Sequence, residues 1–529
     1  MARAVPCFRP WSSAAAAAAR PLSGGGPVRW LLGSLWLHAA LAWQLQRLVV
    51  VGRHSVKNPY PSEGEALLPG VANAPLAAYT GRAMPSFPVP PGELTPRGHV
   101  LMQHLGAYLG ARYADLLKRA GCGRVAVYAD PESQRDVRSA EAFAQAFLGP
   151  GCSAAVNAGA SRRKLRRLFR DVPDAEDRAT GCGPPSAEEL RARLGLDAGG
   201  GAAWLQVYRR QLLLLQQRLS CCAESACAPD PGQGTCTLLG LPWALAPNVT
   251  WRAVGGPLGV ASAFAEIFEM QFCEGLEAGW GLSEEEVVEL LSLLEVPFNQ
   301  AGANEASARN LGSELMHDLL QALSPASPDG APAVVLYFGH DTNLQFLRRM
   351  FDLNWLSQGW WPNVVEPGAQ LVFEVYDGGL NVADGGAAVR ILKVAATPQQ
   401  QRTASPLNAS APPSAVPLWV PGCGDVFCPL PRLLSIGWAA VRRSCVEPLA
   451  ANATAGASAT AAPVPGRSGA QAPAPPAQAS PSGPRAGPVL LAGAAAAAFL
   501  GWRYSRRTRA AARGYEVLGS RIGAPGFSL

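Results

Sequence analysis

The chain has 529 residues, which is enough for one large domain or two smaller ones. Twelve of its 45 Lys and Arg residues lie outside residues 43–450, but only one of its 39 acidic residues does. Residues 43–450 are therefore slightly acidic, which argues against a nucleic-acid partner, because nucleic acids bind to a basic stripe. The low charged content, 16%, fits a globular protein with membrane segments.

Residues 1–42 have the composition of a targeting segment. They contain four arginines and no acidic residue, and a short apolar run covers residues 31–41. The sequence Ala40-Leu41-Ala42 fits the small-residue pattern of a cleavage site. We expect a signal peptide that is cleaved near Ala42, or else an uncleaved signal anchor.

The first strong strand signal ends at a histidine. The apolar, β-branched run at residues 48–51 predicts a buried strand, and Gly52 is followed by Arg53-His54-Ser55-Val56-Lys57. Ligands of open α/β sheets bind just past the C-terminal ends of strands. An imidazole between two cations suits attack on a phosphate ester, because the cations can hold the phosphoryl oxygens. The alternative is a surface loop with a structural histidine.

A loop and a helix follow this strand. Residues 60–91 are rich in Pro, Gly and Ala, and we expect an ordered loop at the rim of the pocket. Leucines at helical spacing predict a helix over residues 98–120 with one buried face.

A second buried strand is expected at residues 124–129. We expect a polar turn over residues 130–139 and a short helix over residues 140–148. Arg135 would then lie past a strand end, beside the proposed pocket, and Arg138 is the competing candidate. Either arginine could instead be a solvated turn residue.

Strand signals fade between residues 161 and 290, where helical patterns dominate. The longer ones cover residues 202–219, 258–274 and 283–294. We expect this part to form a smaller α-helical domain inserted into an α/β fold. A further helix over residues 306–323, with Asn304 as its N-cap, leads back toward the sheet.

A second strand signal also ends at a histidine. The apolar run at residues 333–338 is followed by Gly339-His340-Asp341, so both histidines would stand at strand ends of one sheet. We expect a helix over residues 342–351, strands near residues 370–376 and 388–395, and a loop over residues 397–418. The predicted fold is α/β, a mixed sheet flanked by helices with the helical insertion.

The C-terminal end predicts a membrane anchor. Residues 451–485 consist mainly of Ala, Pro, Ser, Gly and Thr, which is typical of a disordered stalk. Residues 486–502 are uncharged and just long enough to span a membrane, and residues 503–529 form a basic, cytoplasmic tail. We expect a single-pass type I membrane protein whose main domain, residues 45–450, is extracellular or lumenal. A GPI signal is the alternative, and the basic tail argues against it.

The two histidine motifs, Arg53-His54 with Pro59 and the later His340-Asp341, resemble those of the histidine acid phosphatase family (histidine phosphatase branch 2). The segment Leu94-Thr95-Pro96-Arg97-Gly98 is similar to a helix entry of that family. Counting back from Glu141-Ala142-Phe143 assigns Arg135 to its third phosphate-binding segment. The motifs around residues 339–344 most resemble bacterial periplasmic phytases and glucose-1-phosphatases, and the resemblance covers about residues 45–449.

This resemblance implies a phosphoric monoester hydrolase with phytate or sugar phosphates as substrates. It implies that His54 is the nucleophile and that Asp341 protonates the leaving oxygen. The phosphoryl oxygens would be held by Arg53, Lys57, Arg135 and His340. No metal and no cofactor would be needed. A carboxylic acid must be protonated to act as a general acid, which predicts an acidic optimum.

The sequence departs from the family pattern RHGxRxP at Ser55 and Lys57. Lysine keeps the positive charge but lacks the planar fork that binds two oxygens at once. The alternative function is therefore a receptor or scaffold that binds phosphate esters at a degenerate site.

Twelve cysteines and three glycosylation sequons, at Asn248, Asn408 and Asn452, indicate an oxidising compartment. The family resemblance implies three disulfides, Cys122–Cys152, Cys182–Cys445 and Cys423–Cys428. A fourth would join Cys236 to Cys221 or Cys222. The rival interpretation of the cysteines at residues 221–236 is a zinc site, but they lack paired CxxC spacing and a nearby histidine.

Overall fold

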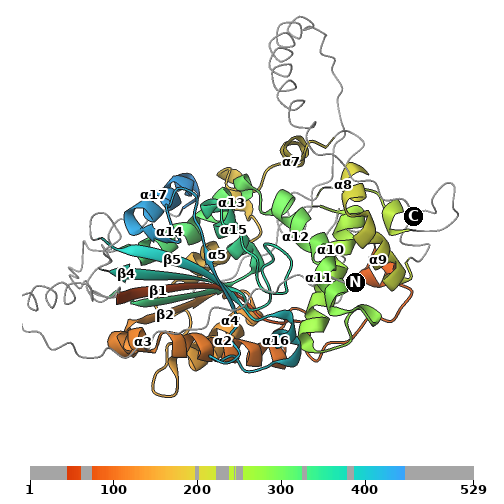
Figure 1. The fold of residues 1–529 in the computed structure, drawn as a ribbon. Helices are drawn as coiled ribbons and strands as arrows, with labels where there is room; N and C mark the ends of the chain where they lie inside the picture. The colour runs from red at the N-terminus through yellow and green to blue at the C-terminus, as the bar shows by residue number, and fades with distance from the viewer. Residues whose placement is uncertain are drawn as a thin grey trace, which may run out of the picture. The chain divides into compact units, whose positions relative to one another are not determined.

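The computed structural model describes residues 44–60, 74–196, 202–221, 237–243, 245, 254–324, 331–377 and 386–446. The predicted leader, stalk, spanning segment and basic tail lie outside these residues. Within them, no helix combines the length and apolar character that a membrane crossing requires. They form a mixed sheet flanked by helices, as the sequence predicts (Figure 1).

The described strands form one seven-stranded sheet in the order β2-β3-β1-β4-β5-β6, and β7 also pairs with β5. Strand β1 is parallel to β3, and β3 is parallel to β2, whereas the remaining pairs are antiparallel. Their bounds are β1 Gln44–Arg53, β2 Val125–Ala129, β3 Val334–Gly339, β4 Gln370–Asp377, β5 Ala388–Ala395, β6 Ser414–Leu418 and β7 Phe427–Pro429.

Helices cover both faces of the sheet (Figure 1). Val49 and Val51 of β1 pack into one hydrophobic cluster and Leu48 and Val50 into another, which explains the unbroken apolar run of this strand. One face is covered by α5 Arg162–Phe169, α13 Glu305–Leu311, α14 Ser313–Leu323, α15 Asp341–Phe351 and α17 Leu430–Ala440. The other is covered by α2 Pro96–Arg112, α3 Ala114–Ala120 and α4 Gln134–Leu148.

A third hydrophobic cluster is built mainly by helices beside the sheet (Figure 1). These are α7 Ala187–Leu194, α8 Ala202–Val207, α9 Arg209–Leu219, α10 Gly256–Glu274, α11 Glu284–Leu290 and α12 Ser292–Pro297. Helix α10 is buried along nearly its whole length, and its Met270 and Phe272 pack against Val56, just past β1. Helix α10 therefore joins the helical part to the sheet. Helix α5, although it lies after residue 161, packs on the sheet.

Several of the predicted elements differ from the structure. The helices predicted over residues 202–219, 283–294 and 306–323 are each divided in two, at Tyr208, Leu291 and Gly312. Helix α4 begins at Gln134, so the polar turn predicted over residues 130–139 is wrong for its second half. The first turn of α4 is polar because it faces a polar pocket, and apolar periodicity therefore misses it. The helix predicted over residues 98–120 breaks at Tyr113, whose hydroxyl donates to Glu374 at 2.9 Å. The loop predicted over residues 397–418 contains α16 Pro398–Thr403 and strand β6.

The cysteine pairing agrees with the family resemblance. Disulfides join Cys122 to Cys152, Cys182 to Cys445 and Cys423 to Cys428. Cys221 is disulfide-bonded, and the other cysteines of residues 221–236 lie outside the described residues. Cys273 is buried and free.

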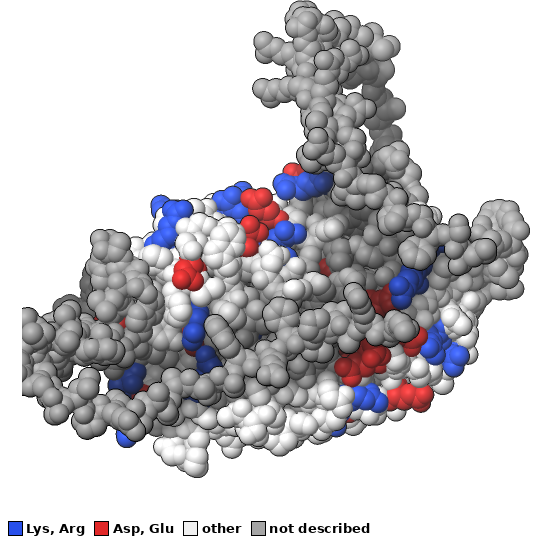
Figure 2. Space-filling view, in the orientation of Figure 1, with Lys and Arg blue, Asp and Glu red and all other residues white. Residues whose placement is uncertain are grey.

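Basic and acidic residues are interspersed over the described surface that Figure 2 shows, and they do not form a stripe of one sign. This distribution matches the weak net charge of residues 43–450. It offers no extended basic track on this face.

Helices α2 and α4 approach each other very closely. A Cβ atom added at Gly106 would lie 2.4 Å from the carbonyl oxygen of Phe143, and one at Gly110 would lie 2.4 Å from that of Phe147. The two glycines therefore set the distance between α2 and the helix that carries Arg135. The contact links the packing of this face to the geometry of the pocket.

Gly106→Ala should lower the free energy of unfolding by about 1–3 kcal/mol, because the methyl group meets backbone atoms that cannot rotate away. In a helix with free space the same change would stabilise by up to about 1 kcal/mol. Urea unfolding of the variant and the natural protein shows whether Gly106→Ala destabilises or stabilises. Gly123→Ala is the control, because a Cβ atom there meets nothing within 4 Å. Stabilisation by Gly106→Ala would contradict the close approach.

Candidate active site

The parallel strands bring three distant segments together at one edge of the sheet. Arg53 pairs with Gly339 across β1 and β3, and Ala129 pairs with Phe338 across β2 and β3. The residues that follow these strands therefore emerge side by side. The His54 amide donates to the Gly339 carbonyl at 2.9 Å, and the Asp130 amide donates to the Phe338 carbonyl at 3.2 Å.

His54 is buried, with 3% of its surface exposed. Its Nδ1 lies 2.8 Å from the carbonyl oxygen of Ser55. A carbonyl oxygen only accepts hydrogen bonds, so Nδ1 carries the proton and Nε2 keeps a free lone pair. Burial lowers the pKa of His54 well below its usual value, and the positive charges of Arg135 and Arg53 lower it further. His54 is therefore a neutral imidazole with one nucleophilic nitrogen.

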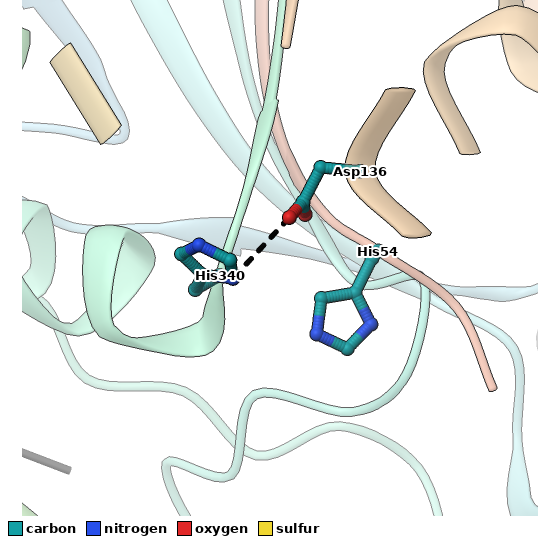
Figure 3. Close-up of side chains that lie close together, drawn as sticks. All are labelled: His54, Asp136 and His340. Atoms are coloured by element: carbon teal, nitrogen blue, oxygen red, sulfur yellow. Dashed lines mark ion pairs between the residues drawn. The ribbon is translucent and has the colours of Figure 1, made fainter. Parts of the chain in front are cut away.

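His340 is held between two carboxylates. Its Nε2 lies 3.0 Å from Asp130 Oδ2, and its Nδ1 lies 3.4 Å from Asp136 Oδ2 (Figure 3). Burial alone would lower the pKa of His340, but the charges of Asp136 and Asp171 and the hydrogen bond to Asp130 raise it to about 9. His340 is therefore a cation at neutral pH, next to a neutral His54. The centres of the two imidazole rings are 6.0 Å apart.

Arg135 lies in the first turn of α4 and reaches the same place. Its Nη2 is 3.4 Å from His340 Nδ1, and its Nη1 donates to the Gly92 carbonyl at 3.4 Å. The protonated Nδ1 of His340 cannot accept a hydrogen bond, so two cationic groups face each other here. An anionic oxygen between them would relieve this repulsion. Arg138, the competing candidate, is exposed and pairs with Glu141 at 3.1 Å.

Arg53 is buried, with 1% of its surface exposed. Its Nη1 donates to the Val365 carbonyl and lies 3.8 Å from Glu269, and its Nη2 lies 3.4 Å from Asp341. Burial alone would lower the pKa of Arg53, but the carboxylates of Asp341 and Glu269 raise it. Arg53 therefore stays charged in the protein interior.

Lys57 forms an ion pair with a residue of helix α10. Its Nζ lies 2.9 Å from Glu266 of α10, and both side chains are largely buried. Burial lowers the pKa of Lys57, and the Glu266 carboxylate offsets part of this effect. Ser55, the other departure from the family pattern, is fully buried, and its amide donates to the Ser139 hydroxyl at 3.2 Å. The backbone here thus accommodates a side chain.

Asp341 begins helix α15 and faces Arg53. Its Oδ1 accepts a hydrogen bond from the Thr342 amide at 2.8 Å, and its Oδ2 is the oxygen near Arg53. Its side chain is 26% exposed, whereas Arg53 is 1% exposed. Asp341 can therefore reach a group that extends from the pocket into solvent.

The structure brings all six predicted residues to this edge of the sheet and adds four acidic residues. Asp130 and Asp136 hold His340, and Glu266 and Glu269 of α10 hold Lys57 and Arg53. Two acidic residues in the middle of an otherwise apolar helix were the available signal for the α10 pair. Asp136 gave no signal of its own, because the sequence placed it in a polar turn.

Three of these side chains have the donor set of a metal site. Ligand atoms of His54, Asp136 and His340 lie within 4.8 Å of one another. The positive potential that lowers the pKa of His54 also opposes a divalent cation. His340 moreover holds a proton where a metal would bind. The charges therefore favour an anion at this position.

Comparison with known proteins identifies the family. The sequence model of the histidine phosphatase superfamily (branch 2) matches residues 44–182 and 260–392. The chain is 32% identical over 400 residues to Phytase AppA of Escherichia coli, which covers 72% of this chain and 88% of that protein. It is 26% identical over 408 residues to Glucose-1-phosphatase of Salmonella typhimurium, which covers 74% and 91%, respectively.

Solved structures agree with this assignment. The phytase from Citrobacter braakii superimposes with a TM-score of 0.62 and 26% identity, covering 76% of this chain and 99% of that one. The Hafnia alvei phytase in complex with tartrate superimposes with a TM-score of 0.63 and 25% identity, covering 77% and 100%. The matched family model includes both histidine motifs, and the chain belongs to the histidine phosphatase superfamily, branch 2.

Proposed function

We propose that this protein is an acid phosphatase that hydrolyses phosphate monoesters through a phosphohistidine at His54. The observation that carries the proposal is the neutral, buried imidazole of His54 among cations. Such a nitrogen is a nucleophile at acidic pH, where an ordinary histidine would be protonated. The surrounding positive charge suits an oxyanion.

The reaction has two displacement steps. His54 Nε2 attacks phosphorus, the bond from phosphorus to the ester oxygen breaks, and Asp341 gives its proton to the leaving alcohol. Arg53, Arg135 and His340 balance the charge of the phosphoryl oxygens. A water molecule then attacks phosphorus and passes a proton to Asp341, and the bond from phosphorus to His54 Nε2 breaks. Inorganic phosphate leaves, and His54 and Asp341 return to their starting protonation states.

Two cations of the pocket lie near carboxyl groups. Lys57 is paired with Glu266, and Arg53 lies near Asp341 and Glu269. Burial raises the pKa of Glu269 to about 8, so this carboxyl is mostly uncharged at neutral pH and competes little with substrate for Arg53.

The relatives supply the substrate classes. One is named a phytase and another a glucose-1-phosphatase, so inositol phosphates and sugar phosphates are the first compounds to test. A binding protein for phosphate esters is the second candidate. The observation that favours it is the ion pair of Lys57 with Glu266, which occupies a cation expected to hold phosphate.

We also propose a type I membrane topology with the phosphatase domain outside the cytoplasm. The leader at residues 1–42, the uncharged segment at residues 486–502 and the arginines after it support this topology. The three disulfides fit an oxidising compartment, and Asn408 of one sequon is exposed.

Hydrolysis of an aryl phosphate by an ectodomain of residues 45–449 should peak at acidic pH and persist with a metal chelator. His54→Ala should reduce kcat by at least about a thousandfold, because the nucleophile is lost. Steady-state assays from about pH 3 to about pH 9 measure both effects. A folded ectodomain without turnover would favour the binding protein.

Asp341→Asn should slow alkyl phosphates by about 100-fold to 10,000-fold, because their leaving oxygen needs a proton. Aryl phosphates should lose much less, since a phenolate leaves without one. The ratio of kcat/KM for the two esters measures the difference. An equal loss on both esters would remove the proton-donor role from Asp341.

His340 should make stability depend on pH in the alkaline range. Its pKa of about 9 in the folded protein exceeds the unfolded value of about 6.5. The contribution of His340 to the free energy of unfolding is therefore fully present below about pH 6.5. This contribution, at most about 3 kcal/mol, should be lost as the pH rises through about 9. Urea unfolding of the protein and of His340→Gln measures it. His99→Gln is the control, and a pH profile that His340→Gln leaves unchanged would contradict the assignment.

A further inference from the structure

Asp136 places in the pocket a second carboxyl group that the family resemblance does not predict, besides Asp341. We propose that Asp136 binds the phosphoryl group as a neutral carboxylic acid and donates a hydrogen bond to a phosphoryl oxygen, so that anion binding takes up a proton. The proposal rests on the proposed function only in placing the phosphoryl group at His54.

The distances among three side chains of the pocket fit contacts to one shared oxygen atom. Ligand atoms of His54, Asp136 and His340 lie within 4.8 Å of one another, and Figure 3 shows the Asp136 carboxylate turned toward His340, with the His54 ring beside them. Two hydrogen bonds of about 2.7–2.9 Å that meet at one oxygen span such a distance. An oxygen of a phosphoryl group at His54 would therefore contact the Asp136 carboxyl.

Asp136 is placed to interact with a ligand. Its side chain is fully buried, and its carboxylate oxygens make no hydrogen bond of ordinary geometry among the described residues, although the Ser133 hydroxyl lies close enough to favour the ionised form. It forms an ion pair with His340 at 3.4 Å, and that histidine has a shorter contact with Asp130. A buried carboxyl without hydrogen bonds is costly unless a ligand supplies the partner.

The charges around Asp136 decide its protonation. Burial raises its pKa, the positive charges of His340 and Arg135 oppose this rise, and the carboxylate of Asp130 adds to it. The Ser133 hydroxyl lies on the same turn and favours the ionised form. An arriving dianion adds negative charge beside the carboxyl and must raise its pKa further. Ionised Asp136 would repel the phosphoryl group, whereas the protonated form is a hydrogen-bond donor to it.

Linkage fixes the sign of the pH effect. The complex holds a proton on Asp136 more tightly than the free protein does. The affinity for the anion therefore has its highest value below the pKa of Asp136 in the free protein. It falls by about tenfold for each pH unit between the pKa values of the free and bound states. Removing the charge of Asp136 removes this fall and leaves the contributions of the other carboxyls.

The test is calorimetric binding of sulfate to the purified full chain at about pH 4.5 to about pH 7.5. Sulfate is chosen because it stays a dianion over this range, unlike phosphate. Asp136→Asn keeps a hydrogen-bond donor of the same shape and removes the charge. Glu132→Gln removes an exposed carboxylate of the same segment, which pairs with Arg162 on the surface, and is the matched control.

We expect Asp136→Asn to bind sulfate at least about tenfold more tightly than the natural protein near neutral pH and equally well in acid. Titrations in buffers of different ionisation enthalpy should show about one proton fewer taken up by Asp136→Asn, and Glu132→Gln should match the natural protein. A fall of affinity with pH that is as steep in Asp136→Asn as in the natural protein overturns the proposal. So does a uniform loss of affinity at all pH values.

Two further measurements keep the test decisive. If Asp136→Asn does not fold, Asp136→Ser also keeps a donor and removes the charge, and sulfate binding by the natural protein without proton uptake overturns the proposal by itself. Because the readout is binding, the two proposals fail separately. Binding of sulfate with proton uptake but without ester hydrolysis would refute the phosphatase function. Ester hydrolysis whose pH profile is the same in Asp136→Asn and in the natural protein would refute the role of Asp136.

Discussion

The in-register parallel pairing of β2, β3 and β1 is the constraint on which the pocket depends. Hydrogen bonds between parallel strands fix where each strand ends relative to its neighbour, so Arg53 stands opposite Gly339. A shift of one residue would turn every side chain of a strand to the other face and would separate His54 from His340. The apolar clusters on both faces of the sheet oppose such a shift, because each strand is buried on both sides.

The pocket is a set of buried charges that balance one another. Arg53, Lys57 and His340 each face a carboxylate, and the unpaired burial of any one would be strongly unfavourable. The acids come from different elements, which include α4, α10 and α15, so the charge balance is complete only in the assembled fold. A phosphate ester that enters the pocket exchanges partners with these carboxylates. Protonation of the acids and anion binding are therefore parts of one equilibrium.

The sequence predicted the parts of the fold that hydrophobic pattern controls. Apolar runs predicted strands β1, β2 and β3. Because parallel strands have their C-terminal ends at the same edge of the sheet, the polar residues that follow them were predicted to lie together there. The first turn of α4 escaped prediction, because a buried polar turn has no apolar period. Glu266 and Glu269 escaped it as well, because nothing local in α10 says that its acids meet Lys57 and Arg53, more than 200 residues earlier. Tertiary contacts of this kind appear only when the chain is folded.

The disulfide between Cys182 and Cys445 has a mechanical consequence. It joins residues that are 263 positions apart, and Cys445 lies at the end of the described phosphatase domain. Tension applied to the chain beyond residue 446 would pass through this sulfur bridge to Cys182 instead of peeling α17 and β7 from the sheet. As long as the bridge is intact, roughly 900 Å of extended chain, including α10 and β3, is shielded from the load. A pull strong enough to unravel the domain would have to begin on the N-terminal side of Cys182.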